Sequence, residues 1–305
     1  MIIGLYEMNR RRFIYNSSIA SLSVLGLNSC NQLFKDVKIT ILHSNDVHSQ
    51  IEPFPVNHNR FPGRGGFARR ASIFNEIRSV NPNTLIFDAG DIFQGTPYFN
   101  FFQGELELKL MKEMGYNAAT IGNHEFDAGL DILKKNILST NFQFITSNYD
   151  FGNTELEGLT TPYKIYKKEG VKIGVFGLGI ELRGLVNPDL YKETKYYDPV
   201  EISDEMVKIL KYEKKCDLVI CVSHLGHEYN SNKVSDTKLA QLTSDIDLII
   251  GGHTHTFLKE PVILKNKKNN NVIINQVGSS GVYLGRIDFN FTNSSKSDTN
   301  SLLEV

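Results

Sequence analysis

The segment from Gly122 to Asp127 places an amide oxygen, an imidazole and two carboxylates within six residues. It follows the apolar run 118–121, which has the composition of the end of a buried strand. Asn123 offers a neutral oxygen to a metal ion or a phosphate, and His124 can donate or accept a proton. Asp127 lies where it could orient that imidazole. This combination predicts metal-assisted chemistry at a strand end.

Polar residues follow four other strand-like segments in the same way. They are Asp46 and His48 after 37–43, Asp91 after 84–87, His224 after 218–222, and His253 and His255 after 246–250. Five of the eight histidines in the chain therefore lie at predicted strand ends. Open α/β sheets bind ligands at the carboxyl ends of their strands, so we expect these residues to meet at one site.

The residue types indicate which ligand this site would hold. Carboxylate oxygens and imidazole nitrogens together suit Zn²⁺, Mn²⁺ or Fe, and the pair His253 and His255 can serve two adjacent ions. Two metal ions about 3.5–4 Å apart need a bridging carboxylate, activate a hydroxide between them and clamp the oxygens of an in-line displacement. The sequence therefore predicts two divalent metal ions and a hydrolytic reaction.

The rest of the chain supplies elements that would position these residues. Helical spacing of apolar residues predicts helices over 65–79, 104–114, 131–139, 201–214 and 237–242. A further strand is predicted over 142–146, a hairpin over 162–177, and antiparallel strands that close the sheet over 262–264, 272–277 and 282–291.

Three connecting segments are less regular. The aromatic segment 93–102 is predicted to be a loop that packs mainly in the core, with stacking on a flat substrate as the alternative. Residues 178–198 are predicted to be a surface excursion, and the polar tail 293–305 is expected to fray.

Composition narrows the class of function. The chain has 305 residues, 41% of them hydrophobic, which is enough for one large core. A net charge of −1 with interspersed signs gives no footprint for nucleic acid, so we expect a small substrate. Of the three cysteines, Cys216 and Cys221 flank a predicted strand and are expected to be buried as small apolar residues.

The N-terminal segment has the features of an export signal. Three arginines at 10–12 precede the short apolar run 17–27, which is too short to span a bilayer, and Cys30 follows. The pattern resembles a twin-arginine signal joined to a lipoprotein box, which implies a lipid on Cys30 and a location in the periplasm or cell envelope. A cytosolic N-terminal helix is the alternative, and Met8 is an alternative start to Met1.

These motifs together resemble the metallophosphoesterase superfamily. The sequences ITILHSNDVHSQIEP and GNHEFDAG are similar to those of the 5′-nucleotidase and 2′,3′-cyclic-nucleotide phosphodiesterase branch, and the resemblance covers nearly all of 37–290. It implies an α/β fold of four layers, an α/β/β/α sandwich with two mixed sheets. The expected parts are an export signal over 1–30, the metallophosphoesterase domain over 31–292 and the polar tail over 293–305.

The resemblance also implies a role for each candidate residue. One metal ion would be held by Asp46, His48 and His255, the other by Asn123, His224 and His253, with Asp91 bridging them. His124 would stabilise the transition state or act as the leaving-group acid during attack by a metal-bridged hydroxide. Asp127 would orient His124, and Asn123 and His124 would also contact the substrate phosphate. Glu125 is expected to be structural.

Substrate choice remains open between several interpretations. Full-length 5′-nucleotidases carry a C-terminal domain that supplies arginines for the phosphate and aromatics for the base, whereas this sequence ends at Val305. We expect either a broad phosphoesterase acting alone or a catalytic subunit that needs a separately encoded specificity domain, with nucleotides or 2′,3′-cyclic nucleotides as substrates. The alternatives are a relative acting on another ester or a sulfur compound, as thiosulfohydrolases do, and a non-catalytic metal-binding surface protein.

Overall fold

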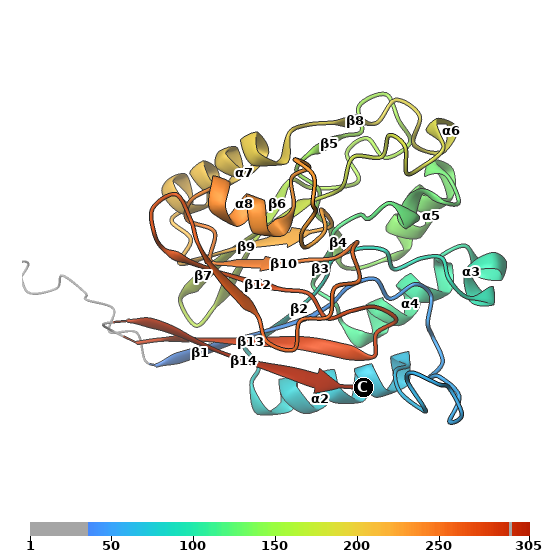
Figure 1. Cartoon of the computed structure of the whole chain (residues 1–305), viewed down its shortest axis with the longest axis horizontal. Coiled ribbons are helices and arrows are strands. Elements are labelled where there is room, and N and C mark those ends of the chain that lie inside the picture. Colours follow the sequence, from blue (N-terminus) through green and yellow to red (C-terminus); the bar gives the residue numbers. More distant parts are fainter. Residues whose placement is uncertain (1–35, 293–294) are drawn as a thin grey trace, which may run out of the picture.

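The computed structural model describes residues 36–292 and 295–305. The predicted export signal and Cys30 lie outside these residues. Two sheets of strands are stacked between two layers of helices (Figure 1), so the predicted four-layer α/β sandwich is confirmed. Among the described residues, no helix is long and apolar enough to cross a membrane.

The first sheet carries three of the predicted ligand segments. Its strands, in spatial order, are β14 (Lys296–Glu304), β13 (Tyr283–Phe291), β1 (Val37–Ser44), β2 (Thr84–Asp88), β3 (Ala118–Ala119) and β4 (Gln143–Phe144). The strand β13 pairs antiparallel with β1, whereas the strands β1 to β4 run parallel to one another. Their carboxyl ends therefore lie at one edge of the sheet, where the segments beginning at Asn45, Ala89 and Thr120 emerge.

The second sheet carries the remaining ligand segments. Its strands, in spatial order, are β11 (Val262–Lys265), β12 (Asn271–Asn275), β10 (Leu248–Ile250), β9 (Leu218–Ser223), β7 (Val171–Leu178) and β6 (Tyr163–Lys168). The central strands β12, β10, β9 and β7 are parallel. The strands β6 and β7 form the predicted hairpin.

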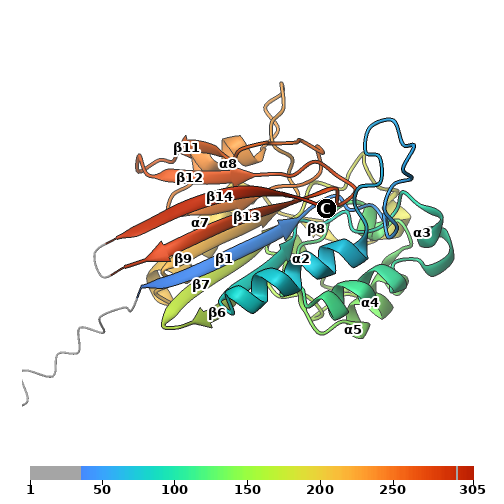
Figure 2. The same ribbon diagram turned by 90° about the horizontal axis from the view of Figure 1, so that it is seen from below.

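The helices cover the outer faces of the two sheets. Figure 2 shows α2 (Phe67–Val80), α4 (Glu105–Met114) and α5 (Leu130–Ser139) beside the first sheet, and Figure 1 shows α7 (Pro199–Val207) and α8 (Asp236–Leu242) beside the second. The shorter elements are α3 (Pro97–Phe102), α6 (Pro188–Tyr191), the 3₁₀ turn η1 (His124–Phe126), the π-helical turn η2 (Lys208–Glu213), and the paired strands β5 (Tyr149–Asp150) and β8 (Lys195–Tyr196).

A continuous apolar core joins the two sheets. It includes Ile39 and Ile41 of β1 together with Val175, Ile220 and Leu248 from the second sheet, all fully buried. Every residue of β1 except Lys38 is buried, because a strand between two layers is covered on both faces. Cys216 and Cys221 are buried, as expected.

Two expectations about these elements were wrong, and two others hold with added detail. The strand β12 pairs in parallel with β10, so it is not part of a purely antiparallel closure. The segment 93–102 contains the helix α3; Phe93 and Phe99 are buried, but Phe101 is 82% exposed. The excursion 178–198 is partly ordered as α6 and β8, and η2 widens the end of the predicted helix 201–214.

The polar tail does not fray over residues 296–305. It forms β14, an edge strand that pairs antiparallel with β13 along its whole length. Val305 is buried, and its carbonyl accepts a hydrogen bond from the amide of Gly65 at 2.7 Å. The polar composition fits an edge strand, because main-chain pairing needs no apolar side chain and a polar edge resists further pairing.

Candidate metal centre

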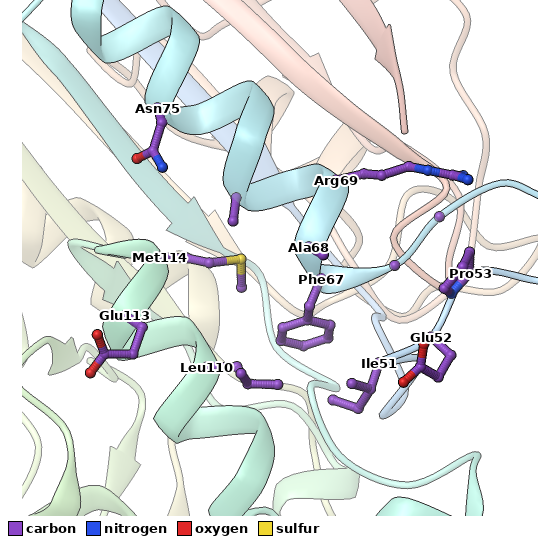
Figure 3. Close-up of a pocket in the computed structure, with 13 residues that line it drawn as sticks. Ile51, Glu52, Pro53, Phe67, Ala68, Arg69, Asn75, Leu110, Glu113 and Met114 are labelled. Carbon is purple, nitrogen blue, oxygen red and sulfur yellow. The ribbon is translucent and has the colours of Figure 1, made fainter.

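The predicted ligands converge from both sheets at the carboxyl ends of their strands. Three groups of side chains have ligand atoms within 4.8 Å of one another: Asp46, His48 and His255; Asp91, His224 and His253; and His48, Asp91 and His124. Because Asp91 and His48 recur in these groups, the three groups form one continuous centre. None of the predicted metal ligands lies in the groove between α2 and α4, which is lined by Ile51, Phe67, Leu110 and Met114 (Figure 3).

The distances divide the centre into two halves on either side of Asp91. On one side, Nε2 of His48 lies 2.8 Å from Nε2 of His255, which lies 3.5 Å from Oδ1 of Asp46. On the other side, Nε2 of His224 lies 3.1 Å from Oδ2 of Asp91. The same Asp91 oxygen lies 3.9 Å from Nε2 of His48, so this carboxylate faces both halves.

Asn123 belongs to the second half. Its amide oxygen lies 2.9 Å from Nδ1 of His253. The amide of His253 in turn donates to Oδ1 of Asp46 at 2.9 Å, which ties the two halves together through the main chain. The structure therefore brings together every residue that the sequence predicted to be a metal ligand.

The orientation of the imidazoles fits a divalent cation. Nδ1 of His224 lies 2.6 Å from the carbonyl of Ala89, and Nδ1 of His48 lies 3.2 Å from the carbonyl of Phe93. Metal-binding histidines commonly donate one ring N–H to a carbonyl, which leaves the other nitrogen for the metal. Nε2 of His224 is fully buried and has no aligned hydrogen bond, as a nitrogen reserved for an ion would be.

Burial sets the charges of the centre. It lowers the pKa of His48 to about 4 and that of His253 to about 3, which keeps both imidazoles neutral, the state that binds a metal. Burial opposes the charge of Asp91, but the nearby imidazole of His224 holds the pKa of Asp91 below its ordinary value. A buried carboxylate of this kind attracts positive charge, which a divalent cation can supply.

The backbone of the centre is held in an unusual conformation. Five of the candidate ligands have left-handed φ angles: Asp46 at 49°, His48 at 50°, Asp91 at 53°, His253 at 72° and His255 at 51°. Such angles cost on the order of 1–3 kcal/mol at each non-glycine residue and cluster at functional sites. The surrounding hydrogen bonds must offset this cost, so the concentration of strain here favours a function for the site.

Two glycines allow the ligand loops to approach each other. Gly90 has a φ of 85°, and a Cβ atom there would come within 2.6 Å of the amide nitrogen of Gly122. A Cβ atom on Gly122 would collide with the carboxylate of Asp91 and come within 2.8 Å of Nε2 of His224. Only glycine fits at these two positions without moving the ligands.

Glu125 holds these two loops together through hydrogen bonds to their main chains. Its buried carboxylate accepts hydrogen bonds from the amides of Gly122 at 2.6 Å, Asp91 at 2.9 Å, Ile92 at 2.7 Å and Phe93 at 3.3 Å. Both oxygens of the carboxylate accept hydrogen bonds from the main chain and do not face the metal centre. This agrees with the structural role expected for Glu125.

Glu125→Gln is expected to destabilise the folded protein by about 1–3 kcal/mol. In the unchanged protein, main-chain N–H groups donate to both oxygens of the Glu125 carboxylate. In the variant, the NH₂ group of glutamine would replace one of these oxygens and would face N–H groups that need an acceptor. Urea unfolding monitored by circular dichroism measures this change. Glu76→Gln, at an exposed position of α2, is the matched control; equal stability of the two variants would contradict the role given to Glu125.

His124 and Asp127 form a pair at the mouth of the centre. Nδ1 of His124 lies 2.7 Å from Oδ2 of Asp127, and the amide of His124 donates to Oδ1 of Asp91 at 2.9 Å. The hydrogen bond with Asp127 raises the pKa of His124. The side chain of His124 is 32% exposed, so a substrate can reach it. The arrangement agrees with the predicted pairing, whereas the catalytic roles stay predictions.

Sequence reasoning did not identify Asn45 and Gln276 as supports of the site. Asn45 Nδ2 donates to Oδ2 of Asp46 at 2.6 Å and to the carbonyl of Gly278 at 2.7 Å. Gln276 Nε2 donates to the carbonyl of Gly252 at 2.5 Å, and its oxygen accepts from Thr254 at 3.0 Å. The sequence signal that could have identified these two residues was a polar side chain in or beside an otherwise apolar strand pattern. His227 is half-buried and lies outside the ligand groups.

Comparisons with known proteins agree with this geometry. Residues 39–257 match the family model described as calcineurin-like phosphoesterase. The chain is 31% identical to the trifunctional nucleotide phosphoesterase YfkN of Bacillus subtilis over 83% of its own length and 18% of that protein. It is 32% identical to a 5′-nucleotidase of Vibrio cholerae over 85% of its own length and 50% of that protein.

A solved structure gives the same result in three dimensions. The 5′-nucleotidase precursor of Thermus thermophilus superposes with a TM-score of 0.80 and 28% identity, over 88% of this chain and 55% of that one. The chain thus spans about half the length of the nucleotidases it matches, and less of YfkN.

Proposed function

Because the chain belongs to the calcineurin-like phosphoesterase family, we propose that it is a metal-dependent hydrolase of phosphate esters, with nucleotides as the favoured substrate class. The family and the mixed α/β fold expected from the sequence are both confirmed. The observation that carries the proposal is the carboxylate of Asp91, which faces two groups of histidine and oxygen ligands. The names of the relatives YfkN and 5′-nucleotidase support nucleotides.

The donor set fits a dinuclear centre of Zn²⁺, Mn²⁺ or Fe ions. Asp46, His48 and His255 would hold one ion and Asn123, His224 and His253 the other, with Asp91 between them. Bound there, the ions would act as Lewis acids toward the phosphoryl group and as the source of a nucleophile at neutral pH.

The chain's own groups supply the remaining chemistry. Asp127 holds Nδ1 of His124, which leaves Nε2 to bind a phosphoryl oxygen or to protonate the departing alcohol. The amide of Asn123 can donate to the phosphate while its oxygen faces His253. Asn123 and His124 lie on the segment that Glu125 joins to Asp91 through main-chain hydrogen bonds. Their distance from Asp91 is therefore fixed before substrate binds.

A chelation experiment tests the reaction class. Protein freed of metal by a chelator is expected to have lost its hydrolysis of phosphate esters, and one of Mn²⁺, Zn²⁺ or Mg²⁺ is expected to restore it. The panel would include nucleoside monophosphates, 2′,3′-cyclic nucleotides, nucleotide sugars, bis-p-nitrophenyl phosphate and, for the sulfur alternative, a thiosulfate ester. Hydrolysis unaffected by chelation would contradict the proposal, and thiosulfate cleavage alone would favour the alternative.

We also propose that the protein is exported and anchored through a lipid on Cys30. The arginines at 10–12, the short apolar run and the small residue before Cys30 support this. Mass spectrometry of the protein from membrane fractions is expected to find an N-terminus at a lipid-modified Cys30. An intact, unmodified N-terminus in those fractions would contradict it.

A separately encoded specificity domain is proposed as a partner. The chain matches about half of the length of its nucleotidase relatives, and such a partner would correspond to the other half of those proteins. Purification from native membranes after mild crosslinking is expected to recover a second polypeptide that lowers KM for nucleotides. Recovery of this chain alone, with full activity, would favour a broad phosphoesterase that acts by itself.

A further inference from the structure

Asp236, the first residue of α8, carries a fully buried carboxyl group that the proposed reaction does not use. Its Oδ1 accepts a hydrogen bond from the hydroxyl of Ser223 at 2.6 Å, and Ser223 directly precedes the candidate ligand His224. In the part of the chain that the structure describes, Oδ2 of Asp236 has no aligned hydrogen-bond partner. An apolar pair of the same shape could be as stable here, so the polar pair indicates a role beyond stability.

The contacts of Asp236 and Ser223 enclose the turn that carries His224. The hydroxyl of Ser223 donates to Asp236 and also accepts from the amide of Leu225 at 3.2 Å. The amide of Asp236 donates to the carbonyl of Gly226 at 2.8 Å. The main chain on both sides of His224 is therefore attached to the start of α8.

The second oxygen of Asp236 faces the turn that carries His253. A Cβ atom on Gly251 would collide with Oδ2 of Asp236, so this oxygen packs against the glycine. A Cβ atom on Gly252 would come within 2.8 Å of Nδ1 of His224. The turns that supply His224 and His253 are thus in direct contact, and Asp236 touches both.

The two turns that Asp236 holds belong to one half of the candidate metal centre. They supply His224 and His253, which are two of the three ligands proposed for one ion. Nε2 of His224 lies 3.1 Å from Oδ2 of Asp91, the carboxylate between the halves. The other ion would be held by the loop after β1 and by His255. A group that orients a ligand acts on the ion that this ligand holds, so the loss of Asp236 should affect one ion more than the other.

We propose that Asp236 positions the turns of His224 and His253 and thereby sets the affinity for the ion that these two histidines hold. The inference rests on the metal-dependent function proposed above. Asp236 is a positioning residue, since none of the groups of candidate ligands found among the described residues includes it. It acts through the hydroxyl of Ser223 and through its contact with Gly251.

Three single substitutions and one double variant test the contact between Asp236 and Ser223. Ser223→Ala and Asp236→Ala each remove the hydrogen bond, and the double alanine variant removes both partners. Asp236→Asn keeps the size of the side chain and an oxygen that can accept from the hydroxyl. Asp204→Asn, at an exposed position of α7, is the matched control.

Two measurements are made on each variant. Mn²⁺ binding is followed by calorimetry, which separates two binding events that differ in affinity. Hydrogen exchange of the peptide 222–228 is measured in chelated protein, as a readout independent of metal and of activity.

Ser223→Ala and Asp236→Ala are each expected to weaken one of the two binding events about 10–100-fold, the usual effect of losing a group that orients a metal ligand. The other event is expected to be unchanged, and exchange of 222–228 is expected to be faster. Asp236→Asn is expected to recover most of the affinity. The double variant is expected to bind no more weakly than Asp236→Ala, because both residues act through one bond. The control is expected to match the unchanged protein.

Unchanged binding of both ions in folded Ser223→Ala and Asp236→Ala would overturn the inference. Equal weakening of both binding events would also overturn it, because a general loss of stability does not select one ion. The same holds if Asp236→Asn binds no better than Asp236→Ala. Ser223→Ala deletes only a hydroxyl group, so it carries the test if Asp236→Ala does not fold.

The outcome also separates this inference from the proposed function. If no phosphate ester is hydrolysed but the alanine variants still lose affinity for one ion, the proposed function fails and the positioning role of Asp236 stands. If the unchanged protein hydrolyses phosphate esters and the alanine variants bind both ions as it does, the inference alone fails.

Discussion

His124→Asn is expected to lower kcat/KM for a nucleoside monophosphate by about 10²–10⁴-fold, the usual contribution of a positioned acid or base. The imidazole is oriented by Asp127 and lies beside Asp91 and His48, whose ligand atoms are within 4.8 Å of its own. Asparagine keeps a polar group but cannot carry the proton to the leaving oxygen. Steady-state kinetics with saturating Mn²⁺ measures the loss.

Metal content separates this role from that of a ligand. If His124 acts on the substrate, the variant is expected to bind as much metal as the unchanged protein, and Asp127→Asn is expected to show a smaller loss of the same kind. His58→Asn is the control and is expected to keep full activity. The ring of His58 stacks on that of Phe54. Full activity of His124→Asn would refute the assigned role.

Asp91→Asn is expected to abolish hydrolysis and to weaken metal binding by more than the roughly 100-fold that loss of an outer partner causes. Its carboxylate lies 3.1 Å from Nε2 of His224 and 3.9 Å from Nε2 of His48, so it is the group through which the two halves of the centre share one ligand. The amide of asparagine removes the charge and one acceptor while keeping the size of the side chain.

Elemental analysis and Mn²⁺ calorimetry measure the effect of Asp91→Asn directly. The main chain at this position is held by Glu125, which the substitution leaves in place, so the fold is expected to persist. Asp131→Asn, an exposed change of the same charge on α5, is the control. Binding of two ions per chain by Asp91→Asn would mean that the bridge lies elsewhere.

Much of the site follows from local sequence pattern. A strand that ends in polar residues can be recognised from a few consecutive residues, as at Ser44–Asp46 or Ser223–His224. Because α/β sheets bind ligands at the carboxyl ends of their strands, these residues are then expected at one edge of the sheet. The ligand types, the nature of the reaction and the structural role of Glu125 could be stated without coordinates, because each depends on neighbouring residues or on the family resemblance.

Only the tertiary structure determined which strands pair and which residues support the ligands. His48 and His255 are 207 residues apart, and their approach depends on how two sheets stack, which no local window records. The polar strand β14 is ordered because β13 offers it main-chain partners, and its own side chains give no sign of this. The left-handed φ angles of the ligands and the buried carboxylate of Asp91 likewise depend on distant contacts. Strain and buried charge become tolerable only when the surrounding structure offsets their cost.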